Sequence, residues 1–115
     1  MTERRKIPRN HLVHYLRLFD RNTNEVLGNM VDISVSGIRL ISEGPVLLDK
    51  LLEIRMDFPE EIQGKHWLTF DAVCVWCRID QSPNLYLSGC EFKRISEEDL
   101  AILNYLIHLY QDEDE

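Results

Sequence analysis

The sequence predicts a mainly β protein, in which six short strands form an antiparallel barrel or sandwich and a helix follows at the C-terminus. Between residues 11 and 93, stretches rich in branched and aromatic side chains alternate with turn residues at a spacing of about ten positions. From Ser96 onward the apolar residues change to helical spacing. With 115 residues the chain is expected to form one domain with a single core.

The strands are expected where the apolar pattern alternates, and turn-forming residues separate them. Asn22-Thr23-Asn24 is expected to form the first turn, and the segment from Pro59 to Lys65 a polar loop. The expected strands span residues 11–21, 25–34, 37–42, 51–58, 66–79 and 85–93. Pro8 fixes its own φ and keeps Ile7 extended, so residues 1–10 are expected to be a flexible N-terminal arm.

A corner is expected within residues 31–41. Apolar side chains occupy odd positions before Gly37 and even positions after it. A straight strand cannot change phase in this way, so Ser36-Gly37 should form a turn or a bulge, with Gly37 at positive φ. The corner would leave Asp32 and Ser34 together on a polar face beside open backbone.

The helix is expected to begin at Ser96-Glu97-Glu98-Asp99, which has the form of a capping box with acidic residues in its first turn. Helical spacing then continues to about residue 110, and one side of the helix should cover the sheet. Its apolar surface is wider than this requires, so the excess is expected to contact a partner. The barrel and helix together would span residues 11–110, and residues 111–115 would be an acidic tail.

The charge distribution limits the classes of ligand. The net charge of −7 disfavours general binding to DNA or RNA. Basic residues gather in positions 1–9, whereas positions 97–115 carry acidic residues and neither Lys nor Arg. A small basic arm on an acidic body suits a compact anion better than a long polyanion.

The sequence also indicates a cellular compartment. No apolar run approaches the roughly 18 residues that a membrane span needs, and the charged N-terminus leaves no room for a signal peptide's apolar core. We therefore expect a cytoplasmic protein without membrane insertion, whose Cys74, Cys77 and Cys90 are reduced thiols.

Two motifs occur in this order along the chain. Arg5 and Arg9 form an Arg-x-x-x-Arg pair, and Asp32, Ser34 and Gly37 form Asp-x-Ser-x-x-Gly one hairpin later. Together with the last strand and the helix, these motifs resemble the PilZ domain family over about residues 3–110. The resemblance implies a six-stranded β-barrel that binds the bacterial second messenger cyclic di-GMP, and it implies no further cofactor.

The resemblance also suggests roles for two other residues. Arg4 precedes the arginine pair, and in this family a third arginine there tends to accompany binding of a stacked pair of cyclic di-GMP molecules. Trp76 lies where family members often carry an aromatic residue near the site, and an indole beside arginines can stack on guanine. The alternative is that Trp76 packs within the barrel. Arg39 is expected to be an exposed barrel arginine that could also touch ligand.

The motif residues suit this ligand chemically. An arginine offers a planar fork to a phosphate or to guanine O6 and N7. An ionised Asp32 only accepts hydrogen bonds, which suits the N–H donors of the guanine Watson–Crick edge. Ser34 can donate to a phosphate or a base, and Gly37 allows close approach to the backbone. The alternative is that the arginines form a solvated basic tail and Asp32 is a turn former.

Other classes of function find little support in the sequence. Cys74-x-x-Cys77 has the spacing of half a zinc site, but on a strand its thiols would face opposite sides, and no second Cys or His pair matches. The histidines form no arrangement of a catalytic triad. We therefore expect a non-enzymatic receptor that signals through an effector protein. The alternative is a PilZ-fold protein adaptor that does not bind nucleotide.

Overall fold

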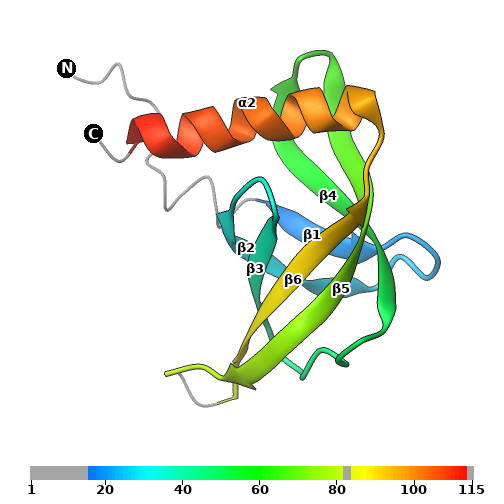
Figure 1. Cartoon of the computed structure of the whole chain (residues 1–115), viewed down its shortest axis with the longest axis vertical. Helices are drawn as coiled ribbons and strands as arrows, with labels where there is room; N and C mark the ends of the chain where they lie inside the picture. Colours follow the sequence, from blue (N-terminus) through cyan, green and yellow to red (C-terminus); the bar gives the residue numbers. More distant parts are fainter. Residues whose placement is uncertain (1–15, 82–83, 114–115) are drawn as a thin grey trace.

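The computed structural model describes residues 16–81 and 84–113. Six strands and one helix make up this part of the chain (Figure 1). They are β1 (Arg17–Asp20), β2 (Val26–Ile33), β3 (Gly37–Ser42), β4 (Leu51–Ile62), β5 (Lys65–Ile79), β6 (Tyr86–Arg94) and α2 (Glu97–Glu113).

The strands close into a barrel in the order β1-β2-β3-β6-β5-β4, and every neighbouring pair is antiparallel. Pairing of β1 with β4 completes the ring. The predicted six-stranded antiparallel barrel with a C-terminal helix is therefore confirmed. Because β3 pairs with β6, the corner between β2 and β3 lies beside the last strand.

The core fills the barrel and continues beneath the helix. Alternate residues of each strand point inward, and Leu18, Met30, Leu40, Ile54 and Phe70 are almost fully buried. The helix crosses one end of the barrel (Figure 1). It contributes a buried stripe at helical spacing, consisting of Ile102, Leu103, Leu106 and Ile107.

The structure corrects three boundaries, at the end of β4, the start of β5 and the end of α2. The segment predicted as a polar loop continues β4 as far as Ile62, and β5 already begins at Lys65. Pairing between β4 and β5 is irregular between Asp57 and Ile62, which accommodates Pro59 because proline lacks an amide donor. The resulting hairpin extends past the barrel towards the start of α2 (Figure 1). The C-terminal end of α2 lies at Glu113, beyond the predicted end near residue 110.

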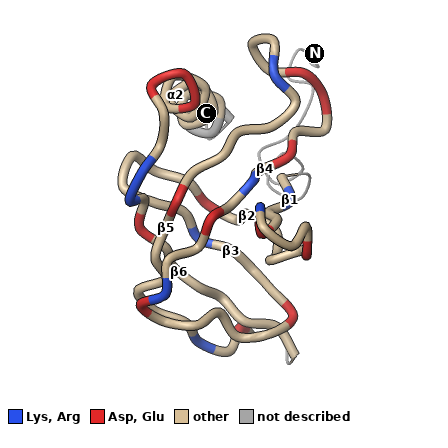
Figure 2. The backbone as a smooth tube through the Cα atoms, turned by 90° about the vertical axis from the view of Figure 1, so that its right-hand side faces the viewer, with Lys and Arg blue, Asp and Glu red and all other residues tan. Residues whose placement is uncertain are grey.

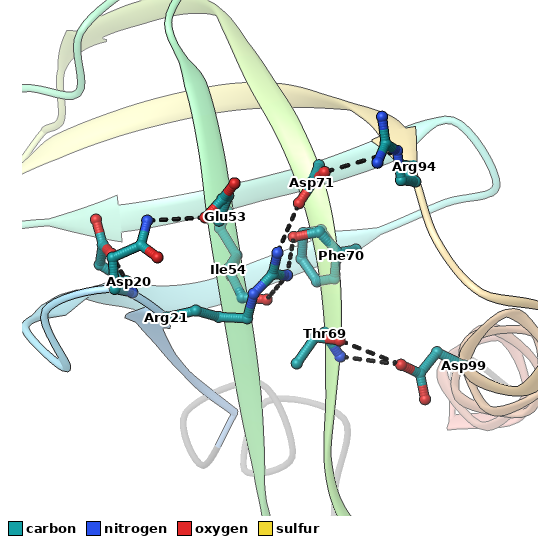
Figure 3. Close-up of polar contacts among 10 residues, drawn as sticks. Asp20, Arg21, Glu53, Ile54, Thr69, Phe70, Asp71, Arg94 and Asp99 are labelled. Atoms are coloured by element: carbon teal, nitrogen blue, oxygen red, sulfur yellow. Dashed lines mark hydrogen bonds and ion pairs between the residues drawn. The ribbon is translucent and has the colours of Figure 1, made fainter.

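The first turn of α2 is fixed to β5 and to this hairpin. Ser96 Oγ accepts the amide of Asp99 at 3.1 Å, as expected for an N-cap. The acidic first turn of α2 is red in Figure 2. The buried Asp99 carboxylate accepts the amide of Thr69 at 3.2 Å (Figure 3). It also accepts Lys65 Nζ at 2.9 Å. The hydrogen bond to Asp99 is the main reason why the pKa of Lys65 is raised. The acidic helix start therefore determines where α2 attaches to the barrel.

Arg21, in the turn after β1, links three strands (Figure 3). Its guanidinium donates to the carbonyl oxygens of Ile54 in β4 and Phe70 in β5, at 3.3 and 3.1 Å. It also forms an ion pair of 2.9 Å with Asp71, whose side chain is only 10% exposed. Arg94 approaches the other oxygen of Asp71 at 3.9 Å but is 86% exposed. Arg21 is therefore the principal partner of a buried carboxylate.

We expect Arg21→Met to lower the free energy of unfolding by about 2 kcal/mol, because it leaves the buried Asp71 carboxylate without its close partner. Chemical denaturation at neutral pH measures this. Arg94→Met is the matched control, since it removes an exposed partner of the same carboxylate, and its effect should stay within about 0.5 kcal/mol. Equal effects of the two substitutions would contradict the assignment.

Candidate functional site

Two β-bulges lie in the strands on either side of the β3–β6 pair and change which side chains face outward there. In β2 the register shifts between Met30 and Asp32, and in β5 it shifts between Cys74 and Trp76. Each bulge adds one residue, which reverses the side to which the following side chains point. Met30 and Cys74 are buried, whereas Asp32 and Trp76 are partly exposed. The bulges therefore turn both residues away from the core.

The strand register aligns four residues in one row across the barrel surface. Asp32 of β2 pairs with Arg39 of β3, and Arg39 pairs with Gly89 of β6. Gly89 in turn pairs with Trp76 of β5. Neighbouring strands are about 4.8 Å apart, so the row spans about 14 Å. An acid, a base, a residue without a side chain and an indole thus lie side by side.

Gly89 makes room for the indole. A Cβ atom at this position would collide with Nε1, Cε2 and Cζ2 of Trp76. The indole therefore occupies the space that any other residue at position 89 would fill. Arg78, two residues further along β5, places its guanidinium carbon 5.1 Å from the centroid of the Trp76 ring. Trp76 is thus held over β6 beside a cation.

Gly37 is required for a different reason from the predicted one. Positive φ angles at glycines of the described chain occur at Gly28 and Gly64, so the prediction of positive φ at Gly37 was wrong. Instead, a Cβ atom at Gly37 would collide with the carbonyl oxygen of Cys90. Only glycine allows the start of β3 to lie this close to β6.

Residues 34–36 link β2 and β3, so the turn lies earlier than the predicted Ser36-Gly37, and Gly37 already belongs to β3. The amide of Ser34 donates to the carbonyl oxygen of Gly37 at 2.9 Å, and Ser34 Oγ accepts the amide of Ser36 at 3.3 Å. The carbonyl oxygen of Ser36 accepts the amide of Phe92, which ties the turn to β6. Val35 is one of the apolar odd positions before Gly37, which were expected to share a face with Ile33. It is 76% exposed at the tip, so this expectation was wrong for Val35. The serine hydroxyls are exposed next to the row.

The carboxylate of Asp32 is held at both oxygens. Oδ1 accepts the amide of Ile33 at 2.8 Å, and Oδ2 accepts Nη2 of Arg39 at 2.9 Å. The side chains of Asp32 and Arg39 are 35% and 48% exposed. Both hydrogen bonds fix the orientation of a carboxylate that remains accessible to solvent.

These residues border one hollow of about 300 Å³ on the barrel surface. Asp32, Ser34, Gly37 and Trp76, which the sequence singled out, all line it. The hollow is also lined by Arg39, Gly89 and Glu91. Glu91 Oε1 lies 3.6 Å from Lys93 Nζ. The predicted site residues Arg4, Arg5 and Arg9 lie outside the described residues.

The sequence alone did not assign Gly89 to the site, and it favoured an exposed surface role for Arg39. A glycine within a strand is itself a signal of close approach by another group. The registers of β6 with β3 and with β5 were the missing information, because together they place Gly89 directly between Arg39 and Trp76.

The cysteines belong mainly to the core, and Cys90 also lines the hollow. The bulge at Val75 brings Cys77 opposite the buried Ser88, so Cys77 points to the same side as Cys74, and the predicted opposite orientation was wrong. Burial is the main cause that raises the pKa of Cys74, and it raises the pKa of Cys90 to about 12. Residues 16–81 and 84–113 hold no group of three or more His, Cys, Asp or Glu arranged to hold a metal ion.

Comparison with known proteins agrees with the barrel and the motifs. The family model for the PilZ domain matches residues 3–109. That match covers nearly the whole chain, and the protein belongs to the PilZ domain family. No curated protein sequence matches it.

Two solved structures share the fold. The inhibitor of motility MotI/DgrA from Bacillus subtilis superposes with a TM-score of 0.65 at 19% identity, over 84% of this chain and 47% of that one. MrkH from K. pneumonia in its apo state gives a TM-score of 0.63 at 19% identity, over 89% of this chain and 50% of that one. The chain thus spans about half the length of these proteins. None of the described helices has the length and apolarity to cross a membrane.

Proposed function

We propose that this protein is a receptor for cyclic di-GMP that acts by binding rather than by catalysis, and that it passes the signal on through contact with an effector protein. The observation that carries the proposal is the convergence of Asp32, Ser34, Gly37 and Trp76 on one hollow. Membership of the PilZ family and the Arg-x-x-x-Arg pair of the sequence support it.

The site offers complementary groups to a guanine dinucleotide. Asp32 presents a fixed acceptor to the N–H donors of guanine, and the serine hydroxyls at the turn can donate to phosphate oxygens. Trp76 offers an aromatic surface near the base. Arg5 and Arg9 would bring bidentate donors from the N-terminal side of the chain.

Isothermal titration of the full chain with cyclic di-GMP tests the proposal. Saturable binding is expected, at two ligands per chain if Arg4 supports a stacked pair. An absence of binding would instead favour the alternative, a PilZ-fold adaptor that recognises only protein.

Asp32 should determine the preference for guanine. The guanine edge presents adjacent N1–H and N2–H donors, whereas adenine presents an acceptor at N1 that would face the carboxylate. Such polar mismatches discriminate strongly. We expect the parent protein to bind cyclic di-GMP at least about a hundredfold more tightly than cyclic di-AMP, and Asp32→Ala to weaken the first while narrowing the difference.

Competition titrations with both nucleotides measure this preference. Asp57→Ala is the matched control, because Asp57 is also a partly exposed aspartate paired with an arginine, Arg55, but it lies outside the hollow. An unaltered preference in Asp32→Ala would show that this carboxylate does not read the base.

A further inference from the structure

Both residues of the Asp32–Arg39 ion pair line the hollow. The two residues are directly opposite in the register of β2 and β3, with 2.9 Å between Oδ2 and Nη2. On the far side of Arg39 the row continues with Gly89, whose side-chain space is taken by the Trp76 indole. Arg39 therefore lines the hollow between Asp32 on one side and the indole on the other.

Most of the donor capacity of Arg39 remains available. A guanidinium carries several N–H donors in a fixed planar fork. Among the described residues, the Arg39 side chain donates one hydrogen bond, to Asp32. About half of the Arg39 side chain is exposed. A ligand group that accepts hydrogen bonds can thus reach Arg39 without displacing Asp32.

The pair presents an acceptor and a donor side by side. The Watson–Crick edge of guanine is the complement of this arrangement, because N1–H and N2–H are donors and the adjacent O6 is an acceptor. A carboxylate alone satisfies only the two donors. With Arg39 bound beside it, the same surface also satisfies O6. Adenine would place an amino group against the guanidinium and an acceptor against the carboxylate.

We propose that Arg39 is a specificity-determining residue, which reads guanine O6 while Asp32 reads N1–H and N2–H of the same base. This inference rests on the proposed function and extends it to a residue outside the Asp-x-Ser-x-x-Gly motif. The Asp32–Arg39 ion pair acts as one recognition unit that exists before the ligand arrives, so binding requires little rearrangement at this point.

Three dinucleotides distinguish recognition of O6 by Arg39 from recognition of the N–H donors by Asp32. Cyclic di-GMP carries O6, N1–H and the N2 amino group. Cyclic di-IMP retains O6 and N1–H but lacks the amino group. Cyclic di-AMP has neither O6 nor N1–H. Substitution of a residue that reads O6 should lower the affinity for the first two ligands by a similar factor. Substitution of a residue that only positions the carboxylate should lower the affinity for cyclic di-GMP most.

Isothermal titration of Arg39→Met with the three dinucleotides is the test. We expect affinity for cyclic di-GMP and for cyclic di-IMP to fall by a similar factor, about tenfold to a hundredfold, while affinity for cyclic di-AMP is unchanged or higher. Arg39→Gln keeps an amide donor for O6 and should recover part of the loss. Arg55→Met is the control, because Arg55 is also paired with an aspartate, Asp57, but lies outside the hollow.

Each other outcome overturns the inference in a recognisable way. An equal loss for all three ligands would mean that Arg39 binds phosphate. A larger loss for cyclic di-GMP than for cyclic di-IMP would mean that it only positions Asp32. No loss with a folded protein, as judged by denaturation, would remove Arg39 from the site. If the parent protein binds none of the dinucleotides, the proposed function itself fails.

Discussion

Alanine in place of Gly37 is expected to lower the free energy of unfolding by about 2–3 kcal/mol. The added Cβ would collide with the carbonyl oxygen of Cys90, and a backbone atom cannot move aside as a side chain can. The start of β3 must therefore separate from β6, which loses ladder hydrogen bonds at the edge of the hollow. Denaturant-induced unfolding of both proteins measures the difference.

Gly44→Ala is the matched control for this experiment. A Cβ atom at Gly44 has nothing within 4 Å, and its φ is not positive. The substitution should be neutral or slightly stabilising, because it reduces the freedom of the unfolded chain. If Gly37→Ala is as stable as Gly44→Ala, then close approach is not the reason for glycine at position 37.

Loss of Arg9 is expected to have the largest effect on ligand binding. Arg9→Ala should weaken binding of cyclic di-GMP by about 2–4 kcal/mol, or about 30-fold to nearly a thousandfold, because it removes a charged bidentate donor. The reason for choosing Arg9 is its place as the second arginine of the pair, directly after Pro8. Arg5→Ala should behave in the same way. Titration of each variant measures the loss.

The fold should survive both substitutions, so thermal unfolding of these variants should match that of the parent. Arg17→Ala provides the control, because Arg17 is an arginine on β1 that does not line the hollow. Titration curves that are the same for the parent, Arg5→Ala and Arg9→Ala would exclude the arginine pair from the binding site.

Much of the barrel could be predicted from the alternation of apolar residues, because most of the buried positions on the strands carry apolar side chains. The pattern was less informative where burial does not control the sequence. The extension of β4 to Ile62 reaches beyond the barrel, and its residues 59–61 are exposed. Polar residues and Pro59 in this segment therefore suggested a loop, although the backbone still forms a hairpin.

The site was predictable as a set of residues but not as a surface. The motif identified Asp32, Ser34 and Gly37, and the structure places them around one hollow with Trp76. The orientation of Trp76 depends on the bulge after Cys74, and simple alternation would have pointed both side chains to the same side. The importance of Gly89 depends on pairing between strands distant in sequence, which no local pattern contains.

Closure of the barrel has a consequence for how a partner can attach. Every described barrel strand pairs with a neighbour on each side, so the ring has no edge strand. A partner therefore cannot bind to the ring itself by adding one of its own strands, which is a common mode of peptide recognition. An effector of the proposed receptor would instead have to recognise side chains, and the affinity of that contact would follow the shape and composition of a surface rather than main-chain complementarity.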